Sequence, residues 1–84
     1  MIITIGKASD NDYVVDDPQV SRHHARLLSE PDGTWLLEDL ESTNGTFVNE
    51  AQIARKRVSR ADQIRLGTQC VVALADLLQA AQHA

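Results

Sequence analysis

The sequence is poor in cysteine and has no long apolar run. Cys70 is the single cysteine among 84 residues, so no internal disulfide can form, which is typical of a reducing compartment and predicts a cytoplasmic location. No stretch approaches the ~20 apolar residues of a membrane-spanning helix. The first five residues are too short for a signal peptide and carry no basic leader. We therefore expect a segment without membrane contact.

Aromatic residues and positive charge are also scarce. Tyr13, Trp35 and Phe47 are the only aromatic side chains, so aliphatic residues must build the core. Eight Lys and Arg stand against twelve Asp and Glu, a net charge of -4. Nucleic-acid-binding domains take most of their affinity from a cationic surface, so nucleic acid is not an expected partner. The length allows one domain.

Short apolar runs cut by turn residues predict an all-β fold. The expected strands are 2–5, 13–15, 24–28, 34–40, 46–48, 63–66 and 70–74. Asn44-Gly45 is the strongest turn dipeptide, and Pro31-Asp32-Gly33 predicts a hairpin turn. Near the end, leucines at positions 74, 77 and 78 follow helical spacing and favour a short amphipathic helix over a frayed end. We place the domain at residues 1–75 and a tail or short helix at 76–84.

Hydroxyl, amide and cationic side chains recur in the predicted loops. They lie in the stretches 5–7, 11–12, 20–25 and 42–49. Such side chains suit a phosphate dianion, which needs several donors and a positive charge at once. A hydrogen bond to a charged group contributes roughly 1.5–3 kcal/mol, so three or four support a micromolar complex after the cost of association.

In this order, these stretches resemble the forkhead-associated (FHA) domain, a family that binds phosphothreonine peptides. The family pattern is Gly-Arg, Asn-Asp, Ser-x-x-His-Ala and Ser-x-Asn-Gly-Thr, with an Asn three residues later. This chain has Gly6-Lys7, Asn11-Asp12, Ser21-Arg22-His23-His24-Ala25 and Ser42-Thr43-Asn44-Gly45-Thr46, followed by Asn49. The resemblance continues through residues 62–67 and covers about residues 3 to 74.

The resemblance implies a β-sandwich of two sheets whose loops at one end bind a phosphothreonine made by a protein kinase. It implies that the hydroxyls of Ser21 and Thr43 donate to the phosphate and that Arg22 adds charge beside it. Asn44 would hold the peptide backbone, and Lys7 would stand where the family has a phosphate-binding Arg. The expected partner is therefore a phosphothreonine-containing protein.

The resemblance also implies structural roles and shows departures. Gly6 and Gly45 would shape the binding loops, and His24 would be a buried brace for them. Lys7 lacks the planar fork with which Arg grips phosphate, which predicts weaker binding than is usual in the family. The chain starts at the strand that is third in the family, so the first two family strands are expected to be absent or to belong to a piece that this sequence does not include. Their absence would expose an edge along 70–74 and favour a homodimer.

Other functions find less support. The neighbours His23 and His24 would point to opposite faces of a strand, and no Cys or carboxylate stands at ligand spacing, so we expect no metal and no cofactor. No Gly-x-Ser-x-Gly turn is present, which argues against an enzyme and leaves no catalytic residue to name. A phospho-independent interaction or dimerisation domain of the same fold remains the alternative. The basic run 55–57 with Arg60 is expected to be a solvated loop, or else a secondary contact for an acidic or phosphorylated partner.

Overall fold

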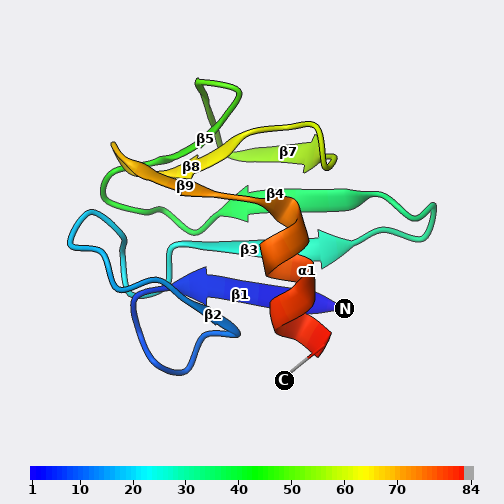
Figure 1. Cartoon of the computed structure of the whole chain (residues 1–84). Helices are drawn as coiled ribbons and strands as arrows, with labels where there is room; N and C mark the ends of the chain where they lie inside the picture. Colours follow the sequence, from blue (N-terminus) through cyan, green and yellow to red (C-terminus); the bar gives the residue numbers. More distant parts are fainter. Residues whose placement is uncertain (83–84) are drawn as a thin grey trace.

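The structure, a computed structural model, describes residues 1–82, with side chains to residue 80. Two β-sheets pack against each other, and one helix follows the last strand of the chain and lies beside the first two, which belong to the larger sheet (Figure 1). The larger sheet has the order β2-β1-β3-β4-β7, formed by β1 (Ile2–Gly6), β2 (Tyr13–Val14), β3 (Ala25–Ser29), β4 (Trp35–Asp39) and β7 (Arg55–Val58). The smaller sheet has the order β6-β5-β8-β9, formed by β6 (Ala51–Ile53), β5 (Thr46–Val48), β8 (Ile64–Leu66) and β9 (Cys70–Val72).

The core lies between the two sheets and is aliphatic, as the shortage of aromatic residues predicts. Ile3 stands opposite Leu27 across β1 and β3, and Leu27 stands opposite Leu37 across β3 and β4. All three side chains are fully buried, as are Ile64 and Leu66 of the facing sheet. Because side chains alternate along a strand, this register turns one face of the larger sheet to the core and the other to solvent.

The helix α1 (Leu74–Gln82) closes one side of the sandwich. Its buried residues Leu74 and Leu77 belong to the core, and Leu78 packs against it. The predicted short helix is therefore confirmed. The predicted strand 70–74 is too long, because β9 ends at Val72 and Leu74 already begins the helix. No helix in residues 1–82 is long and apolar enough to cross a membrane.

Two strands escaped the sequence prediction. The segment that forms β6 has only three residues, too few to show a pattern, and the segment that forms β7 carries no apolar alternation and is expected from the sequence to be a solvated loop. That expectation is wrong: Arg55, Lys56 and Arg57 pair with β4, and Val58 alone is buried in this strand. A strand at the edge of a sheet is fixed by hydrogen bonds to its neighbour, which leave little trace in its own side chains.

Candidate functional site

Three loops meet at the end of the sandwich drawn on the left in Figure 1. They are loop 7–12 after β1, loop 15–24 before β3 and loop 40–45 between β4 and β5. Every binding residue that the sequence singles out lies in one of them. Hydrogen bonds between the loops decide how close these residues stand to one another.

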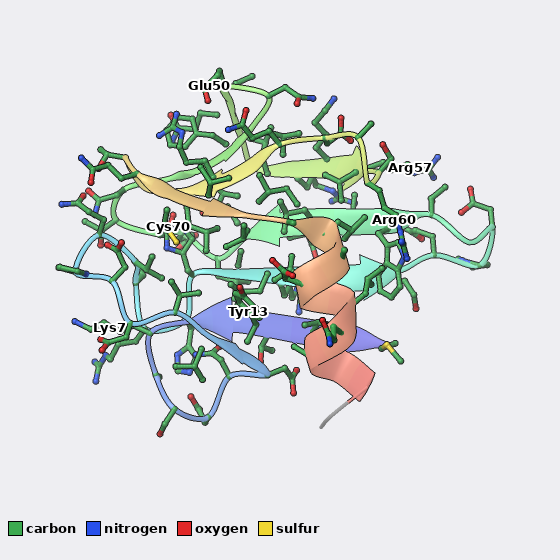
Figure 2. The ribbon with its side chains drawn as sticks, in the orientation of Figure 1. Lys7, Tyr13, Glu50, Arg57, Arg60 and Cys70 are labelled. Carbon is green, nitrogen blue, oxygen red and sulfur yellow. The ribbon has the colours of Figure 1, made fainter. Side chains whose placement is uncertain are left out.

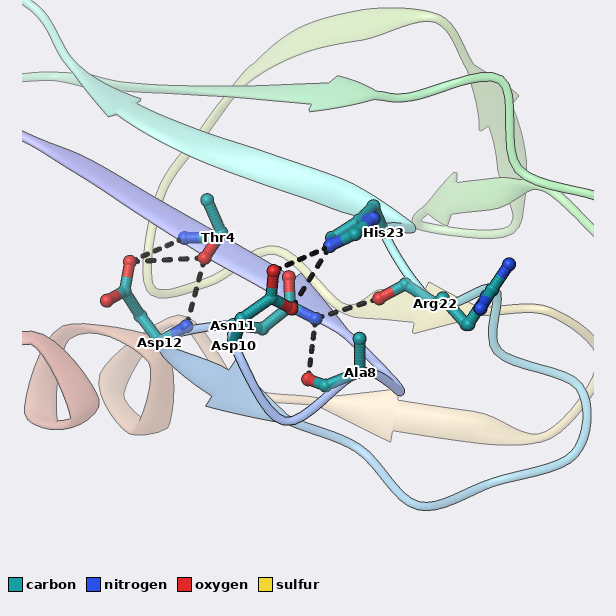
Figure 3. Close-up of polar contacts among 7 residues, drawn as sticks. All are labelled: Thr4, Ala8, Asp10, Asn11, Asp12, Arg22 and His23. Carbon is teal, nitrogen blue, oxygen red and sulfur yellow. Dashed lines mark hydrogen bonds and ion pairs between the residues drawn. The ribbon is translucent and has the colours of Figure 1, made fainter.

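Backbone and amide hydrogen bonds join the first two loops. The N–H of Lys7 donates to the carbonyl oxygen of Ser21 at 3.0 Å, and the N–H of Ala8 donates to that of Arg22 at 3.1 Å. The buried Asn11 amide donates to the carbonyl oxygens of both Ala8 and Arg22 at 2.8 Å, as Figure 3 shows. Asn11 therefore fixes the distance between the segment that carries Lys7 and the segment that carries Arg22.

The close approach of these loops requires a glycine at position 6. A Cβ atom added to Gly6 would lie 2.1 Å from the carbonyl oxygen of Arg22 and 2.9 Å from the Asn11 amide nitrogen. Contacts this short involve backbone, so any side chain would push the two loops apart. Glycine is favoured at position 45 for a different reason, because the φ angle of 89° there lies in the left-handed region.

His24 is fully buried and joins the second and third loops. The N–H of Ser21 donates to its Nδ1 at 3.0 Å, and its Nε2 lies 2.9 Å from the carbonyl oxygen of Gly45. A backbone N–H can only donate and a carbonyl can only accept, so Nε2 carries the proton. One imidazole thus sets the spacing between the loops of Ser21 and Thr43 without facing solvent.

Ser21 and Thr43 touch directly. The N–H of Thr43 donates to Ser21 Oγ at 3.0 Å, while Asn44 Nδ2 donates to the carbonyl oxygen of Gln19 at 2.9 Å. The Ser21 hydroxyl accepts in this contact, so its own hydrogen is available to a ligand. The exposed Asn44 amide likewise retains a second N–H and its carbonyl oxygen.

Asp39 at the end of β4 shapes the third loop and was not singled out from the sequence. Its carboxylate accepts hydrogen bonds from the Ser42 N–H at 3.1 Å, from the Ser42 hydroxyl and from the Thr46 hydroxyl at 2.7 Å. Ser42 Oγ in turn accepts from the N–H of Gly45 at 3.0 Å. The sequence offers only a general signal, since an Asp at the start of a polar turn often accepts hydrogen bonds from the backbone that follows it.

The negative charge of Asp39 is hydrogen-bonded within the domain, whereas the positive charges of Lys7 and Arg22 are exposed. Burial alone would raise the pKa of the Asp39 carboxyl, but the donors from Ser42 and Thr46 outweigh it and hold that pKa below its ordinary value. Lys7 and Arg22 are exposed, and in the part of the chain described neither forms an ion pair. The two positive charges are therefore available to an anionic ligand, while the Asp39 carboxylate is occupied by donors of its own loop.

The structure thus brings all five predicted binding residues to one end. Lys7 lies beside Ser21, and Arg22 is the next residue after Ser21. Thr43 is hydrogen-bonded to Ser21, and Asn44 is hydrogen-bonded to the loop backbone two residues before Ser21.

Comparison with known proteins gives one consistent family. The model of the FHA domain matches residues 3–74. The FHA domain-containing protein FhaB of Mycobacterium tuberculosis is 39% identical over 66 residues, which cover 77% of this chain and 42% of FhaB. The chain spans less than half the length of the curated relatives it matches.

Two solved structures share the fold. One, from a structural and functional analysis of phosphothreonine-dependent FHA domain interactions, is 38% identical with a TM-score of 0.73 and covers 79% of this chain and 68% of its own. The other, Mycobacterium tuberculosis EmbR in complex with a low affinity phosphopeptide, is 31% identical with a TM-score of 0.70 and covers 86% of this chain and 20% of its own.

Proposed function

Because this chain belongs to the FHA domain family, a family of non-catalytic binding modules, we propose that it binds phosphothreonine peptides through the loops that carry Lys7, Ser21, Arg22, Thr43 and Asn44. The observation that carries the proposal is the contact between Ser21 Oγ and the Thr43 N–H. It places two hydroxyl-bearing residues from different loops side by side at the exposed end of the domain. The two related structures, which concern phosphothreonine-dependent interactions and a phosphopeptide complex, support the same ligand chemistry.

The donors available at this end match a phosphate dianion. Ser21 has a free hydroxyl hydrogen, Thr43 has an exposed side chain, and Lys7 and Arg22 supply positive charge without internal partners within the described residues. Charge-assisted hydrogen bonds of this kind are about twice as strong as neutral ones. Since the loops are already fixed by Asn11 and His24, little order has to be created on binding, which preserves affinity.

Asn44 has a different task in this proposal. One of its amide N–H groups is occupied by the carbonyl oxygen of Gln19, and this bond fixes the direction of the side chain. The remaining N–H and the amide oxygen are a donor and an acceptor, which is the pair that an extended peptide backbone requires. Asn44 therefore reads the backbone next to the phosphothreonine, while Ser21 and Thr43 read the phosphate.

The test is a titration of the 15N-labelled chain with one peptide in three forms: phosphothreonine, phosphoserine and unphosphorylated. We expect amide shifts in loops 7–12, 15–24 and 40–45 with phosphothreonine, weaker ones with phosphoserine and none with the unphosphorylated peptide. Equal shifts with and without phosphate would overturn the proposal. An oriented phosphothreonine peptide library then defines the preferred flanking residues.

Lys7 offers a graded test of the same site. A lysine ammonium is a point charge, whereas an arginine guanidinium binds two phosphate oxygens in one plane. We expect Lys7→Arg to tighten phosphothreonine-peptide binding by about three- to tenfold, corresponding to roughly 1 kcal/mol of additional binding free energy. Isothermal titration calorimetry of both forms with one peptide measures it. Equal or weaker binding by the Arg form contradicts the assignment of Lys7 to the phosphate.

One observation favours the phospho-independent alternative. The edge strand β9 pairs only with β8 within the described residues, and Val71 on this strand is 58% exposed. An exposed apolar edge favours pairing with a second copy. This alternative expects a concentration-dependent dimer in sedimentation and no preference for phosphorylated peptide, so a monomer with phosphate-dependent shifts rejects it.

A further inference from the structure

The strongest feature outside the phosphothreonine site is the basic edge strand β7. Arg55, Lys56 and Arg57 lie within it, and Arg60 follows in the next turn. These four residues are half of the eight cations in a chain whose net charge is -4. All four are exposed, and over residues 1–82 none takes part in an ion pair. Such a cluster of exposed positive side chains on an acidic domain indicates a surface for an anionic partner.

The strand lies at the end of the larger sheet, and among residues 1–82 it pairs with β4 and with no other strand. The Asp39 N–H donates to the carbonyl oxygen of Ala54 at 2.8 Å, in the same register as the β4–β7 pairing. Inward and outward backbone groups alternate along an antiparallel edge strand. Lys56 therefore bonds β4, while the N–H and C=O groups of Arg55 and Arg57 point to the open edge.

The side chains of Arg55 and Arg57 lie on the outer face of the sheet. Arg57 is opposite Leu36 and Arg55 is opposite Glu38, and these two residues flank Leu37, which is fully buried on the inner face. Glu38 is already paired with Arg26 of β3 at 2.9 Å, so it does not neutralise Arg55. Two arginines two residues apart therefore stand on one face of an edge whose backbone groups are free.

We propose that β7 binds an extended acidic peptide segment as an additional strand, independently of the phosphothreonine site. The open N–H and C=O groups of Arg55 and Arg57 would pair with the peptide backbone. Acidic side chains at alternate peptide positions fall on the face of the two guanidinium groups, because the side-chain period of a strand is two. Lys56 meets the residue between them on the other face.

Two alternative roles for these cations fit the structure less well. Positive charges on an edge strand prevent pairing with a second copy, which carries the same four cations, but they do not oppose an acidic strand, whose carboxylates neutralise them. Nucleic acid also binds cations, yet β7 carries no aromatic side chain on which bases stack, and the domain as a whole is acidic. An acidic strand matches both the charge and the free backbone groups.

The surface lies away from the phosphothreonine site. Figure 2 shows Arg57 and Arg60 at one end of the domain and Lys7 at the other. A partner that offers a phosphothreonine and an acidic segment could engage both ends at once, and linking two weak contacts in this way raises the overall affinity. The two contacts can therefore be tested separately, and the failure of one leaves the other standing.

The probe is an unphosphorylated eight-residue peptide that alternates glutamate with threonine, added to the 15N-labelled chain at low salt. We expect amide shifts in β7 and β4 and none in loops 7–12 and 40–45. A peptide with lysine in place of glutamate should cause no shifts. The glutamate peptide with every second backbone amide N-methylated keeps its charge but loses edge pairing, so it should fail to bind. Equal binding by the methylated peptide overturns strand addition.

Two variants with the same net charge complete the test. Arg55→Gln with Arg57→Gln removes two cations from β7, whereas Gln52→Glu with Gln79→Glu adds two anions at exposed positions of β6 and α1. We expect the first pair to weaken binding of the glutamate peptide about tenfold and the second pair to change it by less than about twofold. Equal losses mean that only the overall charge matters and overturn the proposal. Tighter binding of a single-stranded oligonucleotide of equal charge at β7 also overturns it.

Discussion

Replacement of Ser21 by alanine is expected to weaken phosphothreonine-peptide binding by about 10- to 100-fold, since one hydrogen bond to a charged group is worth roughly 1.5–3 kcal/mol. The hydroxyl has two roles. Its hydrogen is free to donate to the phosphate, and its oxygen accepts the N–H of Thr43 at 3.0 Å. Ser21→Ala therefore removes one donor and also loosens the position of the second hydroxyl-bearing residue. Calorimetric titration with one phosphothreonine peptide measures the loss.

The matched control for this substitution is Ser29→Ala. Ser29 is an exposed serine at the far end of β3, where its hydroxyl bonds the amino terminus. We expect phosphopeptide affinity to stay within about twofold of the unmodified chain. Thr43 is exposed, so water replaces Ser21 as the partner of its N–H, and Ser21→Ala should cost at most about 1 kcal/mol of unfolding free energy. A folded Ser21→Ala chain with unchanged affinity would show that Ser21 does not contact phosphate.

Replacement of Asp39 by alanine is expected to lower the unfolding free energy by about 3 kcal/mol, because hydroxyl donors to a charged acceptor lose their partner. The Thr46 hydroxyl belongs to a fully buried residue, so water does not readily replace the carboxylate. The Ser42 hydroxyl also orders the N–H of Gly45. Loop 40–45 should therefore lose its shape, and phosphopeptide binding should weaken together with stability. Urea unfolding followed by fluorescence measures the stability.

A double-mutant cycle separates the hydrogen bonds of Asp39 from its packing. Thr46→Val removes the buried hydroxyl while keeping a side chain of similar shape. In the Asp39→Ala background this change should cost less than in the unmodified chain, because the hydroxyl has no acceptor left. Glu38→Ala, one residue earlier and on the outer face, should cost less than about 1 kcal/mol, since its ion pair with Arg26 is partly exposed. An Asp39→Ala chain as stable as the Glu38→Ala chain would refute the role assigned to Asp39.

The Asp39 carboxylate also makes the free energy of unfolding depend on pH in the acidic range. Burial opposes its charge, but the hydroxyl donors of Ser42 and Thr46 prevail and keep the pKa of Asp39 below 3.8 in the folded chain. The unfolded chain thus takes up this proton first on acidification. The stabilisation from Asp39 is present above pH 3.8 and is lost as the pH falls through the folded pKa. The pKa values of Asp32 and Asp62 are also lowered, mainly by donors from Thr34 and Asn49. These two carboxyls contribute equally to the pH dependence of the unmodified chain and of the Asp39→Ala chain. Asp39→Ala should therefore flatten the acid limb of the stability curve.

The sequence by itself determined the family, the two-sheet sandwich, the terminal helix and the residues proposed to bind phosphothreonine. The strands and the helix rest on local patterns, such as short apolar runs and turn dipeptides like Asn44-Gly45, whereas the sandwich and the binding residues follow from the resemblance of the loop motifs to the FHA family. Such patterns involve only a few neighbouring residues, so they can be recognised without knowledge of the rest of the fold.

Only the tertiary structure decided how the loops are held and that the basic run forms an edge strand. Asp39 gathers donors from Ser42 and Thr46, and His24, expected from the resemblance to be a brace, bonds Ser21 of its own loop and Gly45 of loop 40–45, so the partners of both residues are known only from the fold. The strand β7 owes its form to hydrogen bonds with β4 and not to its own side chains. Backbone pairing between distant segments leaves no pattern in either segment alone, which is why the sequence could not reveal it.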